Sequence, residues 1–89
     1  MIHVEQINDT SFKVTIDGRR TTVHWVTLAP DDYLRLTGGR VSHKQLIEMS
    51  FEFLLEREPN TSILGQFELP VIERYFPEYV DDIQGRIGD

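Results

Sequence analysis

The chain has 89 residues, of which 39% are hydrophobic and 27% charged, so it can form one packed core and we expect a single domain over residues 1–89. It holds no cysteine, which excludes a disulfide framework, a thiolate nucleophile and a cysteine zinc site and favours a cytoplasmic location. The formal charge of −6 is uneven, with +1 on residues 1–45 and −7 on residues 46–89, so a phosphate-binding surface is expected only in the first half.

The clearest strand lies at residues 12–16. Phe12, Val14 and Ile16 alternate with polar residues, a period of two that places the apolar side chains on one face. Asp17-Gly18 follows and is typical of a tight hairpin turn with positive backbone angles. The pattern therefore predicts a β-hairpin.

The returning strand at residues 21–28 has apolar side chains on both faces. Its inward pair is either Val23 with Trp25 or Val26 with Leu28, and the pattern does not choose. Residues 2–7, followed by the turn residues Asn8-Asp9, predict a first strand of the same meander. Three antiparallel strands with one exposed apolar face are not stable alone, so we expect helices from the rest of the chain to pack on that face.

Pro30 predicts the first turn of a short helix that ends at Gly38-Gly39. Ser42 and Gln45 form a capping-box pattern at the start of a second helix, whose apolar residues recur at helical spacing up to Pro59. From Asn60 onward, prolines divide the chain into short helices. We therefore expect an α+β fold in which a three-stranded antiparallel β-meander is covered on one face by a main α-helix and several short C-terminal helices.

Few residues point to catalysis or metal binding. His3, His24 and His43 lie in different elements without metal-ligand spacing, so ordinary surface roles are expected, although Trp25 could bury His24. Ser50 lies on the apolar face of the main helix, where we expect a small residue that allows close packing. No catalytic residue, metal ligand or cofactor is predicted.

Glu48, Glu52 and Glu56 form one acidic stripe on the main helix. The stripe is either a solvated helix face, which we favour, or a docking face for a basic partner or a carboxylate metal site. Glu78, Asp81 and Asp82 are expected on the solvated side of the last helix.

Two small cationic groups are weak candidates for anion or nucleic-acid contacts. Arg40, His43 and Lys44 surround a helix start, where an anion could bind, but a glycine pair between helices more often serves only as a C-cap. Arg19 and Arg20 follow the predicted hairpin turn and either contact nucleic acid or keep the sheet edge soluble.

The C-terminal region has more apolar surface than three short helices can bury. Four aromatic residues form the candidate interface: Phe67, Tyr75, Phe76 and Tyr79. Some of this surface must pack on the sheet, and the remainder would suit a homodimer or a protein partner.

The segments FEFLLEREP (51–59), SIL (62–64), FEL (67–69) and IERYFPEY (72–79) give the C-terminal half a resemblance to a group of short bacterial proteins of unassigned function. The resemblance implies a bacterial cytoplasmic protein. It carries over no catalytic or binding residue.

The sequence thus favours a small non-enzymatic protein-interaction module, with a homodimer as one form. The alternatives are a small regulator that contacts nucleic acid through the N-terminal hairpin, with Arg19, Arg20, Lys13 and Arg40 as its contacts, and a small anion-binding or ligand-binding domain. The chain's start lacks a basic segment followed by an apolar run, and no stretch is long and apolar enough for a bilayer, so neither export nor a membrane partner is expected.

Overall fold

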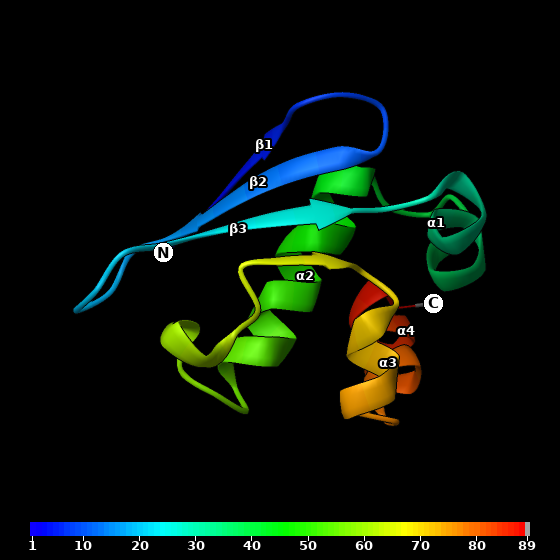
Figure 1. Cartoon of the computed structure of the whole chain (residues 1–89). Coiled ribbons are helices and arrows are strands. Elements are labelled where there is room, and N and C mark those ends of the chain that lie inside the picture. The colour runs from blue at the N-terminus through cyan, green and yellow to red at the C-terminus, as the bar shows by residue number, and fades with distance from the viewer. Residues whose placement is uncertain (89) are drawn as a thin grey trace.

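The computed structural model, which describes residues 1–88, places a β-sheet over a layer of helices (Figure 1). The elements in chain order are β1 (Ile2–Gln6), β2 (Ser11–Ile16), β3 (Thr22–Thr27), α1 (Pro30–Thr37), α2 (His43–Leu55), a 3-10 turn η1 (Asn60–Ser62), β4 (Gln66–Glu68), α3 (Val71–Tyr75) and α4 (Tyr79–Ile87). The predicted α+β class is confirmed.

The sheet has four strands in the order β1-β2-β3-β4. The first three form the predicted antiparallel meander. The prediction of only three strands is wrong, because β4 pairs with β3 in parallel, with Val26 opposite Phe67. A three-residue strand shows too little alternation to be recognised, and its pairing depends on a neighbour some 40 positions away in the chain.

The predicted hairpin forms, but its turn is wider than the dipeptide Asp17-Gly18 indicated. Ile16 pairs with Thr22, so residues 17–21 make the connection. Gly18 does not have a positive φ, unlike Gly38 and Gly39. The loop between β2 and β3 projects beyond the end of the sheet, away from the body of the molecule (Figure 1).

The inward face of β3 is now defined. Val26 and Leu28 are 1% exposed, whereas Val23 and Trp25 are 41% and 47% exposed on the open face of the sheet. His24 shares the inward face and is 2% exposed, so its expected surface role is wrong. Because both faces of this strand carry apolar side chains, the sequence alone could not show which face is buried.

The two predicted helix signals are confirmed. Pro30 is at the first position of α1, and Gly38 ends that helix with a φ of 62°. At the start of α2 the backbone N–H of Gln45 donates to Ser42 Oγ at 3.0 Å, and the N–H of Ser42 donates to Gln45 Oε1 at 2.8 Å.

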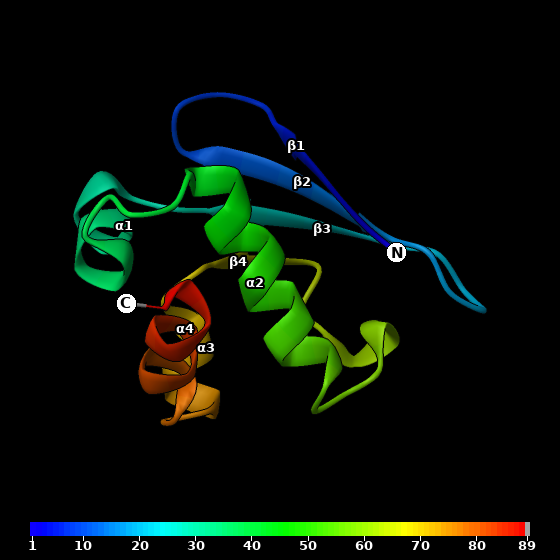
Figure 2. The same ribbon diagram turned by 180° about the vertical axis from the view of Figure 1, so that it is seen from behind.

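The core lies between the sheet and α2, which crosses beneath the strands (Figure 2), and α4 packs against the far side of α2. The buried core residues are Val4, Phe12, Val14, Ile16, Val26, Leu28, Leu36, Leu46, Ile47, Phe51, Phe53, Leu54, Ile63, Leu69, Ile72, Tyr79 and Ile83. Phe51 is fully buried in this core, and its ring centroid lies 5.5 Å from that of His24 and 6.0 Å from that of Phe67.

Candidate functional site

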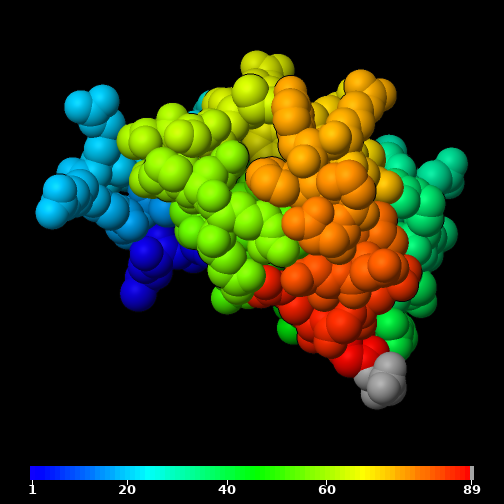
Figure 3. All heavy atoms as spheres, turned by 90° about the horizontal axis from the view of Figure 1, so that it is seen from below, coloured from blue at the N-terminus to red at the C-terminus, as the bar shows by residue number. Residues whose placement is uncertain are grey.

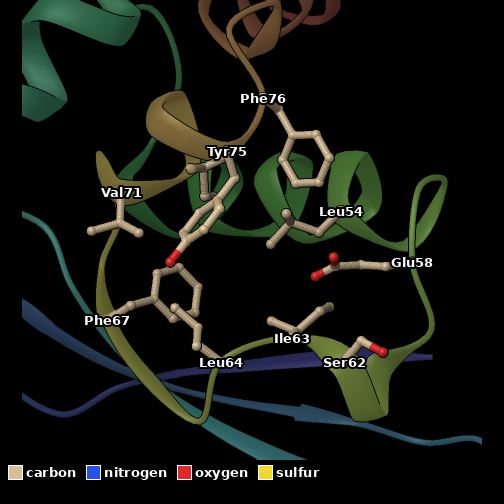
Figure 4. A pocket seen from close by; sticks show the side chains of 10 residues that line it. Leu54, Glu58, Ser62, Ile63, Leu64, Phe67, Val71, Tyr75 and Phe76 are labelled. Atoms are coloured by element: carbon tan, nitrogen blue, oxygen red, sulfur yellow. The ribbon is translucent and has the colours of Figure 1, made fainter.

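An apolar groove opens where the end of α2, the η1–β4 segment and α3 meet. It encloses a cavity of about 290 Å³. Its lining residues are Leu54, Glu58, Ser62, Ile63, Leu64, Phe67, Val71, Ile72, Tyr75 and Phe76 (Figure 4). A cavity of this size is at the small end of ligand pockets, and it suits one or two side chains better than a large cofactor.

The η1–β4 wall of the groove is tied to β3 by a partly buried polar network around His24. His24 Nδ1 lies 2.7 Å from the carbonyl oxygen of Leu64, and His24 Nε2 lies 2.9 Å from Thr22 Oγ1. Because a carbonyl only accepts, Nδ1 carries a proton, and in the neutral ring Nε2 then accepts from the Thr22 hydroxyl. Asn60 Nδ2 donates to the carbonyl of Arg20 at 2.8 Å and to Thr22 Oγ1 at 2.9 Å. The buried histidine therefore holds Leu64 in position.

Tyr75 and Leu64 stand on the two sides of the groove with large exposed surfaces, 66% and 47% respectively. Both also line a second, shallower hollow of about 530 Å³ that continues past β4 toward Thr27 and Arg74. In Figure 3 the yellow-green segment after α2 and the orange residues of α3 lie side by side on this face of the molecule. Exposed aromatic and aliphatic side chains around a concave surface are typical of protein-binding sites.

Three of the four predicted interface residues meet in this groove. Phe67 and Phe76 are half-buried and contribute their rings to its lining, and Tyr75 is exposed. Tyr79 does not belong to this surface, since it is completely buried between α2 and α4 and packs against Phe53 at 5.3 Å. Burial raises the pKa of Tyr79 well above its usual value.

Glu58 is the one acidic side chain of the cavity lining, and its carboxylate is directed into the cavity (Figure 4). No cationic side chain of residues 1–88 forms an ion pair with it. The neighbouring Arg57 instead stacks over Phe53 at 3.6 Å and pairs with Glu78 at 3.2 Å. A half-buried carboxylate beside apolar walls is therefore free to meet a cation from outside.

Of the acidic residues expected on the solvated side of the last helix, Glu78 and Asp81 are exposed and Asp82 is half-buried. Asp82 pairs with Arg86 at 2.5 Å and lies 3.8 Å from Arg57 Nη2. Hydrogen bonds from its own backbone N–H and from Arg57 lower the pKa of Glu78. Glu56 pairs with Arg86 at 2.7 Å, so the acidic stripe on α2 is partly neutralised at its C-terminal end.

The residues of the weak anion candidate are engaged with other parts of the protein. Arg40 Nη1 donates to the carbonyl of Gly88 at 2.7 Å, and the His43 ring stacks on Tyr33 at 3.7 Å. The capping box already satisfies the N–H of Gln45 at this helix start. Lys44 is exposed. Arg40 and His43 are thus held by contacts within the protein and do not form an anion pocket with Lys44 in this structure.

Arg19 and Arg20 are exposed at the projecting hairpin tip. Arg40 lies in the α1–α2 connection, at the opposite end of the molecule (Figure 1). Lys13 is on the open face of the sheet, with its Nζ 5.7 Å from the Trp25 ring. The cations of the nucleic-acid alternative thus divide between the β2–β3 hairpin and a distant loop.

Sequence reasoning did not find Leu64, Glu58 or Ser62 as parts of this site. Pro59 and Pro70 bracket the η1–β4 segment, where the sequence predicted short helices and did not indicate a surface that this segment would line. Within residues 1–88, no group of three or more acidic or histidine side chains could hold a metal ion, and no helix is long and apolar enough to cross a membrane.

Comparison of the chain with protein-family models, curated proteins and solved structures gives no match.

Proposed function

We propose that this chain is a small non-enzymatic protein-interaction module, and that the groove between β4 and α3 is its docking site. The observation that carries the proposal is the convergence of Phe67, Tyr75 and Phe76 with the exposed Leu64 around one apolar cavity. When a partner covers apolar surface that is exposed at a concave site, the removal of that surface from water favours binding.

The partner is a different protein or a second copy of the chain. A cytoplasmic location is included in the proposal and rests on the cysteine-free sequence. The resemblance of the C-terminal half to short bacterial proteins supports a bacterial origin.

Two measurements test this function. Light scattering over a range of protein and salt concentrations determines whether the chain self-associates, and selection from a library of displayed protein fragments determines whether it binds other sequences. We expect one of the two to be positive for the wild type and to be lost in Tyr75→Ala. Leu34→Ala is the matched control, because Leu34 is 57% exposed on α1, outside the groove.

A strictly monomeric wild type that enriches no fragment, or binding that Tyr75→Ala leaves unchanged, would show that the groove is not a docking site. Both variants must first show the wild-type circular dichroism spectrum, since only folded variants report on the surface.

Nucleic-acid contact through the β2–β3 hairpin is the second candidate function. The exposed Trp25 ring beside Lys13 supports it, since an aromatic side chain and a cation on an open sheet can stack a base and meet a phosphate. Anisotropy of a labelled single-stranded oligonucleotide tests it. Binding should weaken steeply with salt and be reduced in Arg19→Ala/Arg20→Ala, and an absence of binding at low salt would remove this candidate.

A further inference from the structure

Strand β4 is an edge of the sheet with a free row of backbone groups. The N–H of Trp25 donates to the carbonyl of Gly65 at 2.8 Å, and the N–H of Leu69 donates to the carbonyl of Thr27 at 2.9 Å. Alternate residues of a strand bond to opposite neighbours, so the peptide groups of Gln66 and Glu68 face away from β3. Within residues 1–88 they meet no further strand, because β4 is last in the sheet order.

The two hollows of the candidate site lie along this edge and not along β1, the other edge of the sheet. Phe67, Val71 and Tyr75 line both of them, and neither has a lining residue from β1. An extended segment that pairs with an edge strand obtains its affinity from backbone hydrogen bonds and its specificity from pockets that receive alternate side chains. The edge of β4 offers both.

The charge of the site indicates what the segment should carry. Glu58 in the cavity and Glu68 beside the edge are acidic, and Arg74 is the one basic residue that lines either hollow. The surrounding half of the chain, residues 46–89, has a net charge of −7. A second copy brings a net charge of −6, which repels such a site, so a basic segment of another protein is the better complement.

We infer that the groove binds an extended segment of a different protein, in which a large apolar side chain is separated by one residue from a lysine or arginine, so that both side chains lie on the same face of the strand. The segment pairs with the peptide groups of Gln66 and Glu68, its apolar side chain enters the cavity between Phe67 and Tyr75, and its cation meets Glu58. This inference rests on the proposed function and specifies the partner and the mode of binding.

The test uses synthetic peptides of about eight residues, roughly 26 Å long when extended. Their scaffold alternates threonine and valine, with one central leucine or phenylalanine and, two positions away on the same face of the strand, a variable residue that is lysine, glutamine or glutamate. Fluorescence anisotropy gives the affinity for the wild type, Glu58→Gln and Glu52→Gln. Glu52 is the matched control, since it is exposed on α2 and does not line the groove.

The expected result is that the lysine peptide binds the wild type about two- to fivefold more tightly than the glutamine peptide, as a partly exposed ion pair allows, with the glutamate peptide weakest. Glu58→Gln should abolish this preference, and Glu52→Gln should retain it. N-methylation of the peptide residues that face β4 should weaken binding about tenfold through lost backbone hydrogen bonds.

Equal affinity for the lysine, glutamine and glutamate peptides would overturn the inference about the partner's charge and leave docking in the groove intact. Insensitivity to N-methylation would overturn pairing with β4. If no peptide binds the wild type better than Tyr75→Ala, the inference fails as a whole. The proposed function is then decided separately by the light-scattering and fragment-selection experiments.

Discussion

The Tyr79 hydroxyl and the Ser50 hydroxyl lie 2.6 Å apart in the centre of the helical layer, where both side chains are fully buried. Ser50 Oγ also donates to the carbonyl of Leu46 at 2.7 Å, so its single proton is used and Tyr79 is the donor to Ser50. This bond anchors α4 to α2 and explains two features of the sequence. Ser50, a polar residue on the apolar face of the main helix, accepts the hydrogen bond from Tyr79. Tyr79 is buried and does not contribute to the groove that Phe67, Tyr75 and Phe76 line.

We predict that Ser50→Ala destabilises the protein more than Tyr79→Phe does. Ser50→Ala leaves the Tyr79 hydroxyl buried without a partner, at a cost of about 1–3 kcal/mol, whereas Tyr79→Phe removes a hydrogen bond worth about 1 kcal/mol and leaves Ser50 bonded to Leu46. The double variant should cost less than the sum of the two. Urea denaturation measures all three, and the reverse order of the single variants would disprove the assignment of the donor.

The raised pKa of Tyr79 predicts a loss of stability in alkali. Burial disfavours the phenolate in the folded state, so the unfolded chain ionises first, at its usual pKa of 10. The stabilisation is complete below pH 10 and declines above it, by up to about 1.4 kcal/mol per pH unit. Urea midpoints between pH 9 and about 11 should therefore fall more steeply for the wild type than for Tyr79→Phe. Parallel curves would contradict this prediction.

His24 is predicted to stabilise the docking groove through Leu64. In His24→Leu the carbonyl of Leu64 and the hydroxyl of Thr22 lose their buried partner, which should cost about 1–3 kcal/mol. Hydrogen exchange should accelerate in the η1–β4 segment more than in β1. His3→Leu is the control, since His3 is exposed and, among residues 1–88, its ring pairs with Asp17 alone. Unchanged protection near Leu64 would show that the histidine does not hold this wall.

Arg57 is predicted to matter more for stability than Arg74, although both are arginines near the groove. Arg57 covers the Phe53 ring at 3.6 Å and pairs with Glu78, whereas Arg74 forms no ion pair within residues 1–88. Arg57→Ala should cost about 1 kcal/mol through lost packing and cation–π contact, and Arg74→Ala should be within about 0.5 kcal/mol of the wild type. Thermal denaturation distinguishes the two, and equal melting temperatures would contradict the prediction.

Two glycines should respond in opposite directions to alanine. Gly38 has a φ of +62°, a conformation that costs a side chain about 1 kcal/mol, so Gly38→Ala should destabilise the end of α1. Gly85 lies within α4 with open space at its Cβ position, so Gly85→Ala should stabilise the protein by about 0.5–1 kcal/mol. Urea midpoints that shift in the same direction would refute this assignment.

Local signals in the sequence determined most of the secondary structure. The alternation in residues 12–16, Pro30 and Gly38 at the ends of α1, and the Ser42–Gln45 capping box each depend on neighbouring residues, so each could be interpreted without knowledge of the fold. The apolar excess near Tyr75 was also visible in composition, which is why three of the four predicted interface residues lie in the groove.

Tertiary structure alone decided the remaining features, because they depend on partners distant in the chain. β4 exists as a strand because β3 offers a free edge to Gly65 and Leu69. The inward face of β3 was decided by the packing of α2, since both phases of its alternation were apolar. Tyr79 is buried beside Phe53, where Ser50, 29 residues away, accepts the hydrogen bond of its hydroxyl. Glu58 belongs to the groove because the chain folds the η1–β4 segment back beside α2. A sequence pattern shows which side chains need burial or a partner, and only the assembled core shows which of them obtain it.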